Sequence, residues 1–178
     1  MGLFTFVHMQ NKQIFLIGFM GAGKTTLGNK IAEKLGVSFI DIDQEIESLL
    51  GMTISSVFEK NGEEFFRTQE SKMLLDVILS QKQAIVSVGG GLPCFNNNME
   101  LMNKSGLTCY LKSPAEELYR RLKNSTINRP LLKELNDEEL LRFIESKLLE
   151  REKYYNEAKL IVPTEDQYLD RIIELLKV

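Results

Sequence analysis

Histidine, cysteine and tryptophan are scarce in this sequence: its 178 residues include one histidine, two cysteines and no tryptophan. The single histidine, His8, stands in an N-terminal arm without helical or strand periodicity, so we do not expect histidine catalysis. Cys94 and Cys109 lie in unlike contexts and have no metal-ligand spacing. We interpret them as reduced thiols of a cytoplasmic protein.

The sequence also lacks a secretory signal, a membrane span and a basic excess. Residues 1–12 have no basic start, apolar core and cleavage site, and no apolar run approaches the roughly 18 residues of a membrane-spanning helix. The 22 Lys and Arg against 25 Asp and Glu give a net charge of −3. We therefore expect no membrane and no nucleic-acid partner, whereas a small anion needs only two or three well-placed arginines.

Short apolar runs alternate with longer helical patterns, which is typical of an α/β fold with a parallel sheet. The predicted strands are residues 14–17, 38–42, 85–88, 107–111 and 160–162. Two stretches interrupt the alternation. Residues 43–80 hold more helix than one crossover needs and predict an inserted substrate-binding subdomain, and the polar residues 124–136 have the length typical of a lid loop. The whole chain, residues 1–178, is expected to form one domain.

One motif carries most of the chemistry: Gly-x-x-x-x-Gly-Lys-Thr at residues 18–25, between a predicted strand and a predicted helix. Its glycines let backbone N–H groups turn inward around phosphates. Lys24 can reach the β- and γ-phosphates, and Thr25 can hold Mg²⁺. The alternative, a glycine-rich turn with a stray lysine, would not need this strand and helix context. The motif predicts a bound nucleoside triphosphate with Mg²⁺.

Charged residues follow at the positions where an acceptor could bind. Asp41 and Asp43 share a face at the end of the second predicted strand. One could bind Mg²⁺ while the other acts as a base toward an acceptor hydroxyl, or the pair could simply cap the next helix. Arg67 and Glu70 are three residues apart on a predicted helix. They could form a pair that orients the guanidinium, or a solvated surface ion pair.

Gly89, Gly90 and Gly91, called here the glycine triplet, follow the third predicted strand. They would let backbone N–H groups approach a ligand closely, although a mobile turn is an alternative interpretation. Arg129, in the predicted lid, could move onto the transferring phosphoryl group. Arg151 could be a second anion contact or a surface arginine of its helix.

Taken together, these residues resemble the shikimate kinase family of nucleoside-monophosphate-kinase-like P-loop enzymes. The resemblance runs from about residue 14 to the C-terminus and rests on a set of motifs in order. They are Asp41-x-Asp43, Gly62-Glu63 with Phe66-Arg67-x-x-Glu70, Gly89-Gly90-Gly91, Arg129-Pro130-Leu131-Leu132 and Arg151-x-x-x-Tyr155-x-x-Ala158. It implies a three-layer α/β/α fold whose parallel sheet has the order 2-3-1-4-5. It also implies a monomeric cytoplasmic kinase that uses ATP and one Mg²⁺ to phosphorylate the 3-hydroxyl of shikimate.

The resemblance further implies roles for single residues. The catalytic residues would be Asp43 as the base, Lys24 and Arg129. ATP would be bound by Gly21, Ala22, Gly23, Lys24, Thr25, Thr26, Arg121 and Arg129, with Arg121 packed on adenine. Shikimate would be bound by Asp43, Phe58, Phe66, Arg67, Glu70, Gly89, Gly90, Gly91 and Arg151. Mg²⁺ would be held by Thr25 and Asp41.

Two departures and two rival functions accompany this interpretation. The lid between Arg121 and Asp137 is a few residues longer than in compact family members, and residues 1–12 have no counterpart in shorter ones. A related small-molecule kinase such as gluconate kinase would share the P-loop, but it is not expected to carry the whole set of motifs. A catalytically silent nucleotide-binding module should have lost some of the charged site residues, and all of them are present here.

Overall fold

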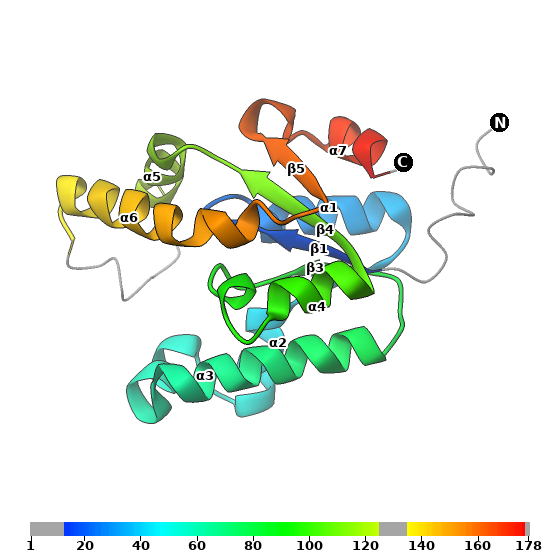
Figure 1. Cartoon of the computed structure of the whole chain (residues 1–178), viewed down its shortest axis with the longest axis horizontal. Helices are drawn as coiled ribbons and strands as arrows, with labels where there is room; N and C mark the ends of the chain where they lie inside the picture. The colour runs from blue at the N-terminus through cyan, green and yellow to red at the C-terminus, as the bar shows by residue number, and fades with distance from the viewer. Residues whose placement is uncertain (1–12, 125–134, 177–178) are drawn as a thin grey trace.

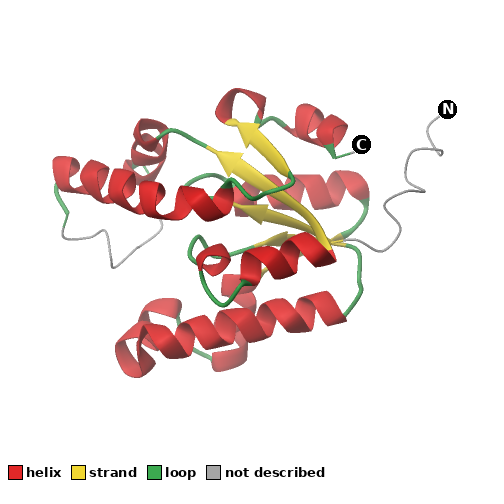
Figure 2. Ribbon diagram, viewed as in Figure 1, coloured by secondary structure: helices red, strands yellow, loops and turns green. Residues whose placement is uncertain are grey.

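Residues 13–124 and 135–176 are described by the computed structural model of the chain. They form a five-stranded parallel sheet with helices on both faces (Figures 1 and 2). The strands are β1 (Gln13–Ile17), β2 (Ser38–Asp41), β3 (Ala84–Ser87), β4 (Gly106–Lys112) and β5 (Leu160–Pro163). Their order across the sheet, β2-β3-β1-β4-β5, confirms the expected fold and strand order.

Seven α-helices and two short 3₁₀-helices occupy the described residues. They are α1 (Lys24–Leu35), α2 (Ile42–Leu50), α3 (Ile54–Leu79), η2 (Leu92–Cys94), α4 (Asn98–Ser105), α5 (Ala115–Lys123), α6 (Asp137–Tyr155), η4 (Thr164–Asp166) and α7 (Leu169–Leu175). The helices expected in residues 43–80 are α2 and α3, and α3 bends at Gly62, where φ is 80° and ψ is 173°. Helix α4 has no counterpart among the predicted elements. No described helix is long and apolar enough to cross a bilayer.

The two layers of helices are set by alternation along the central strand β1, which is buried over its whole length. Ile14 and Leu16 belong to a core with residues of α1, α5, α6 and α7. Phe15 and Ile17 belong to the opposite core, with residues of α2, α3 and α4. In Figure 1, α3 and α4 accordingly lie on the other side of the sheet from α1 and α7. Successive side chains of a strand face opposite sides, so this pattern requires two covered faces.

The carboxyl ends of β1, β2 and β3 lie level at one edge of the sheet. Leu16 of β1 and Asp41 of β2 both pair in register with Ser87 of β3. The segments that leave this edge are residues 18–25, called here the phosphate loop, the start of α2 and the glycine triplet. In open parallel sheets this edge is where ligands bind.

Candidate active site

The phosphate loop joins β1 to α1 at this edge. Gly18, Gly21 and Gly23 have φ values of 143°, 82° and 92°, which a side chain disfavours. Gly23 is also the N-cap of α1, so the positive end of the helix dipole lies at the loop. The Lys24 ammonium donates hydrogen bonds to the carbonyl oxygens of Gly18 and Phe19, at 2.8 and 3.0 Å. The loop therefore places a helix N-terminus and a lysine ammonium side by side, two groups suited to a phosphate.

Thr25, in the first turn of α1, contacts the carboxylate at the end of β2. Its hydroxyl donates a 2.8 Å hydrogen bond to Oδ2 of Asp41. The Oδ1 atom of Asp41 accepts from the backbone N–H groups of Asp43 and Gln44, at 3.2 and 3.5 Å, which makes Asp41 the N-cap of α2. Asp41 thus combines the helix-capping role with a place beside the phosphate loop. Its capping also ends β2 one residue before the predicted strand end at Ile42.

This pair of oxygen groups fits Mg²⁺. An alcohol oxygen and a carboxylate oxygen are the hard ligands that the ion prefers. Within residues 13–124 and 135–176, no group of three or more His, Cys, Asp and Glu side chains could hold a metal. Mg²⁺ usually takes one or two carboxylates and completes its shell with water and substrate phosphates.

Asp43 lies in the first turn of α2, and one oxygen of its carboxylate lacks a hydrogen-bond donor. The Oδ1 atom is buried and has no hydrogen-bond partner. Burial, reinforced by the charge of Asp41 and opposed by Lys24, raises the pKa of Asp43 to about 6. A carboxylate with a raised pKa and a vacant acceptor position is suited to take a proton from a hydroxyl group.

Arg67 of α3 is held between two carboxylates. Its Nη1 donates to Oε2 of Glu70 at 2.5 Å, and its Nε and Nη2 donate to Oε1 of Glu63 at 3.1 and 2.9 Å. The side chains of Arg67 and Glu70 are 12% and 1% exposed, which rules out a solvated surface pair. Burial outweighs the charge of Arg67 and raises the pKa of Glu70 to about 7. The pair therefore holds the guanidinium in one orientation, the first of the two alternatives given above.

Three aromatic rings surround the same guanidinium. Its carbon Cζ lies 5.9 Å from the ring centre of Phe58, 5.3 Å from that of Phe66 and 4.4 Å from that of Phe95. Phe58 and Phe66 also contact each other, with ring centres 4.7 Å apart. These two were expected near the site, whereas Phe95 was not.

The glycine triplet packs directly against these charged groups. A Cβ atom at Gly89 would lie 2.6 Å from Oε1 of Glu70 and 2.8 Å from Oδ1 of Asp43. One at Gly91 would lie 2.6 Å from Nη1 of Arg67. No residue of the triplet has a positive φ. A side chain at Gly89 or Gly91 would therefore displace the charged groups that now fill the space beside the triplet.

Gly90 links the triplet to α6 and to the phosphate loop. A Cβ atom there would lie 3.3 Å from Nη1 of Arg151 and 3.4 Å from the carbonyl oxygen of Gly18. The guanidinium of Arg151 stands 5.5 Å from the ring centre of Phe19, so Arg151 turns toward the site. The hydroxyl of the fully buried Tyr155 donates a 2.5 Å hydrogen bond to the carbonyl oxygen of Gly90. The structure thus brings Asp43, Arg67, Glu70 and Arg151 together around the triplet.

Arg121 contacts the phosphate loop from α5. Its Nη1 donates to the carbonyl oxygens of Gly21 and Ala22 at 3.5 and 3.4 Å, and its Nε donates to Glu117 at 2.7 Å. The expected adenine contact of Arg121 stays a prediction. Arg129 lies outside the described residues, as do residues 125–134 of the predicted lid.

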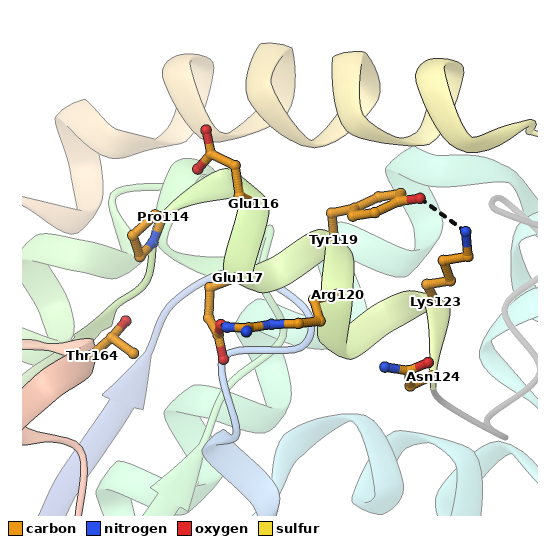
Figure 3. A pocket seen from close by; sticks show the side chains of 8 residues that line it. All are labelled: Pro114, Glu116, Glu117, Tyr119, Arg120, Lys123, Asn124 and Thr164. Carbon is orange, nitrogen blue, oxygen red and sulfur yellow. Dashed lines mark hydrogen bonds and ion pairs between the residues drawn. The ribbon is translucent and has the colours of Figure 1, made fainter.

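A pocket of about 660 Å³ lies along α5 (Figure 3). It is lined by Pro114, Glu116, Glu117, Tyr119, Arg120, Lys123, Asn124 and Thr164. Glu117 forms ion pairs with both Arg120 and Arg121, so the pocket lies next to the residue that contacts the phosphate loop. The sequence had not indicated this pocket.

Comparison with known proteins agrees with this geometry. A family model described as "Shikimate kinase" matches residues 20–177. The shikimate kinase of Azobacteroides pseudotrichonymphae is 46% identical over 165 residues, which cover 93% of this chain and 97% of the relative. This chain belongs to the shikimate kinase family.

Solved shikimate kinases have the same fold. The structure from Bacteroides thetaiotaomicron has a TM-score of 0.89 at 39% identity, covering 94% of this chain and 99% of that one. The Acinetobacter baumannii shikimate kinase in complex with shikimate has a TM-score of 0.81 at 35% identity, covering 97% and 95%.

Two residues at the site of this shikimate kinase family member received no role from the sequence. Tyr155 stands in the last family motif, but only its contact with Gly90 shows what it holds. Phe95 follows Cys94 with no periodicity or motif around it. Nothing in the sequence shows that its ring lies against Arg67, which is 28 positions earlier in the chain.

Proposed function

We propose that this protein transfers the γ-phosphoryl group of ATP to the 3-hydroxyl of shikimate, giving ADP and shikimate 3-phosphate for aromatic amino acid biosynthesis. The observation that carries the proposal is the convergence on one glycine triplet of a phosphate loop, a buried carboxylate and two arginines. A carboxylate-bearing alcohol needs a cation for its carboxylate and an acceptor for its reacting hydroxyl proton. The structure of the Acinetobacter baumannii relative in complex with shikimate supports shikimate as that substrate.

In the proposed reaction, Asp43 accepts the proton of the 3-hydroxyl while the hydroxyl oxygen attacks the γ-phosphorus. The bond from the γ-phosphorus to the bridging oxygen breaks, and ADP leaves. The vacant Oδ1 atom of Asp43 is available for the proton. Lys24 and Arg129 would neutralise charge on the transferring group, which supplies much of the catalysis in phosphoryl transfer.

The carboxylate of shikimate would bind Arg67 and Arg151, with a backbone contact from Gly90. Glu70 would orient Arg67 through their 2.5 Å hydrogen bond. Phe58 and Phe66 would line the wall of the substrate pocket, and the rest of the glycine triplet would form its floor.

ATP would lie along the phosphate loop with its phosphates against the backbone and side chains of Gly21, Ala22, Gly23, Lys24, Thr25 and Thr26. Arg121, which contacts the loop at Gly21, would pack on adenine, and the neighbouring pocket along α5 would give the base room. Thr25 and Asp41 would hold one Mg²⁺, which when bound neutralises phosphate charge.

We further propose a monomer that works in the cytoplasm as one kinase domain. All described site residues come from a single chain, so the proposed site needs no second copy. Cys94 and Cys109 are free thiols, which suits a reducing compartment.

A coupled assay with shikimate, gluconate and nucleoside monophosphates as alternative acceptors tests the substrate. We expect ADP release from ATP when shikimate is the acceptor, and none with gluconate or the nucleoside monophosphates. Turnover of gluconate with shikimate inert would overturn the proposal in favour of a related small-molecule kinase, and ATP binding without turnover of any acceptor would indicate a silent module.

Two variants test the roles. Asp43→Asn should keep ATP binding and lose at least about 100-fold in kcat, the size of a general-base effect. Arg67→Ala should raise the KM for shikimate much more than the KM for ATP. Arg142→Ala, whose ion pair with Glu138 is largely exposed, is the matched control and should change neither.

A further inference from the structure

The ring of Phe95 is partly exposed to solvent and lies beside the guanidinium of Arg67, which two glutamates hold. The residue is 37% exposed, yet its ring centre is the nearest of three to the Arg67 guanidinium, at 4.4 Å. That distance falls within the range of a cation–π contact. The two other rings, of Phe58 and Phe66, stand farther from the guanidinium and belong to the same helix as Arg67.

The turn that carries Phe95 is fastened to that helix. The side-chain amides of Asn96 and Asn98 both donate to the hydroxyl of Ser71, each at 3.0 Å. The Ser71 hydroxyl in turn donates to the carbonyl oxygen of Arg67, also at 3.0 Å. Ser71, one helical turn after Arg67, therefore connects the turn to the backbone of Arg67.

This turn has an unfavourable backbone. Asn96 and Asn97 have φ values of 52° and 55°, two left-handed residues in succession. Asparagine tolerates this conformation better than most residues, but it still costs free energy. Asn98 is 2% exposed, and its amide also donates to the carbonyl oxygen of Leu92 at 3.1 Å. Phe95 stands just before these strained, hydrogen-bonded residues, and its ring is partly exposed. Together these features indicate a role for the ring.

We infer that Phe95 is a positioning residue, held through the bonds of Asn96 and Asn98 to Ser71, which fixes the Arg67 guanidinium for the substrate carboxylate. The inference rests on the proposed function. Glu63 and Glu70 hold the guanidinium by hydrogen bonds, and the Phe95 ring, centred 4.4 Å from Cζ, limits how far the guanidinium plane can turn. Bidentate binding of a carboxylate requires that plane to be correctly set.

Phe95→Leu and Phe95→Tyr test the inference. Leucine keeps the apolar bulk without an aromatic face, and tyrosine keeps the face. We expect Phe95→Leu to raise the KM for shikimate about tenfold, with the KM for ATP unchanged, and Phe95→Tyr to restore the wild-type KM for shikimate. Leu79→Ala removes another exposed apolar side chain, at the far end of α3, and should change neither value.

A double-mutant cycle shows whether Phe95 acts through Arg67. In an Arg67→Ala background, Phe95→Leu should cause no further loss of shikimate affinity by calorimetry. Ser71→Ala, which frees the turn, should raise the KM for shikimate in the same direction as Phe95→Leu, and by less.

Equal KM values for Phe95→Leu and wild type would overturn the inference, as would equal losses with leucine and tyrosine or additive losses in the cycle. Each of these results presupposes a wild-type enzyme that phosphorylates shikimate. Failure of the wild type to do so would instead overturn the proposed function.

Discussion

The Tyr155 hydroxyl donates a 2.5 Å hydrogen bond to the carbonyl oxygen of Gly90. Tyr155 closes α6 and is fully buried, with its ring centre 5.1 Å from that of Tyr110 on β4. One hydroxyl therefore connects the helix that carries Arg151 to the middle of the glycine triplet. This bond holds Gly90 beside the helix of Arg151.

Tyr155→Phe should lower the free energy of unfolding by about 0.5–1.5 kcal/mol, because it removes the part-buried hydrogen bond to the Gly90 carbonyl. It should also raise the KM for shikimate more than the KM for ATP. Denaturant unfolding and steady-state kinetics measure the two effects. Tyr154→Phe removes a neighbouring hydroxyl that has no such contact with the triplet, and it should change neither. A Tyr155→Phe enzyme with wild-type kinetics would show that the triplet is held without this bond.

Gly91→Ala should displace Arg67, since the added methyl group would lie 2.6 Å from Nη1 and 2.8 Å from Cζ of that side chain. The expected result is a rise of at least about tenfold in the KM for shikimate. Gly51→Ala is the control: Gly51 has a φ of 64° and no atom within 4 Å of the added Cβ. It should cost about 1 kcal/mol of stability with kinetics unchanged. Wild-type affinity in Gly91→Ala would show that Arg67 can bind shikimate from another position.

Thr25→Ala should raise the Mg²⁺ concentration needed for half-maximal activity by about tenfold, because an oxygen ligand is lost. Thr25→Ser should retain the wild-type requirement. Asp41→Asn should behave like Thr25→Ala while staying folded, since asparagine is as good an N-cap as aspartate. Activity at varied Mg²⁺ and fixed ATP measures this, with Thr68→Ala as an exposed control on α3. An unchanged Mg²⁺ requirement in both variants would remove Thr25 and Asp41 from the metal site.

Activity should fall on the acid side near pH 6, because burial raises the pKa of Asp43 to about 6 and only the ionised form can accept a proton. The value of kcat/KM should drop about tenfold per pH unit below that point. An unperturbed aspartate would place this fall near pH 4 instead. A profile that stays flat down to pH 5 would contradict Asp43 as the base.

The raised pKa of Asp43 affects stability in the opposite direction: activity rises with pH, whereas the free energy of unfolding falls. The folded state of Asp43 binds its proton more tightly than the unfolded state, for which 3.8 is the ordinary pKa. This contribution to stability is present below about pH 4 and is lost as the pH rises through 6. Asp43→Asn should therefore be more stable than wild type at pH 8, by about 1–3 kcal/mol, and the difference should vanish near pH 4. Thermal unfolding of both proteins without ligands across this range measures it.

Much of the fold could be predicted because its determinants are local. Strand positions, the phosphate loop and the helices of residues 43–80 follow from apolar periodicity and glycine placement, and the structure confirms them. Helix α4 was not predicted because it has only eight residues. Its buried Met99 and Met102 give too short an apolar pattern to indicate a helix. The end of β2 shifted because Asp41 caps a helix, and strand and helix compete for such boundary residues.

The sequence by itself determined which chemical groups are available: a triplet of glycines, a phosphate loop with its lysine, and the carboxylates and arginines in the order of one family. Only the tertiary structure decided where each group lies and what surrounds it. A side chain at Gly89 or Gly91 would displace Asp43, Glu70 or Arg67, which occupy the space beside them. The pKa of Asp43 is raised because burial removes water from it. Phe95 contacts Arg67, 28 positions away, and Tyr155 contacts Gly90, 65 positions away. Contacts across such separations depend on packing that no local sequence pattern encodes.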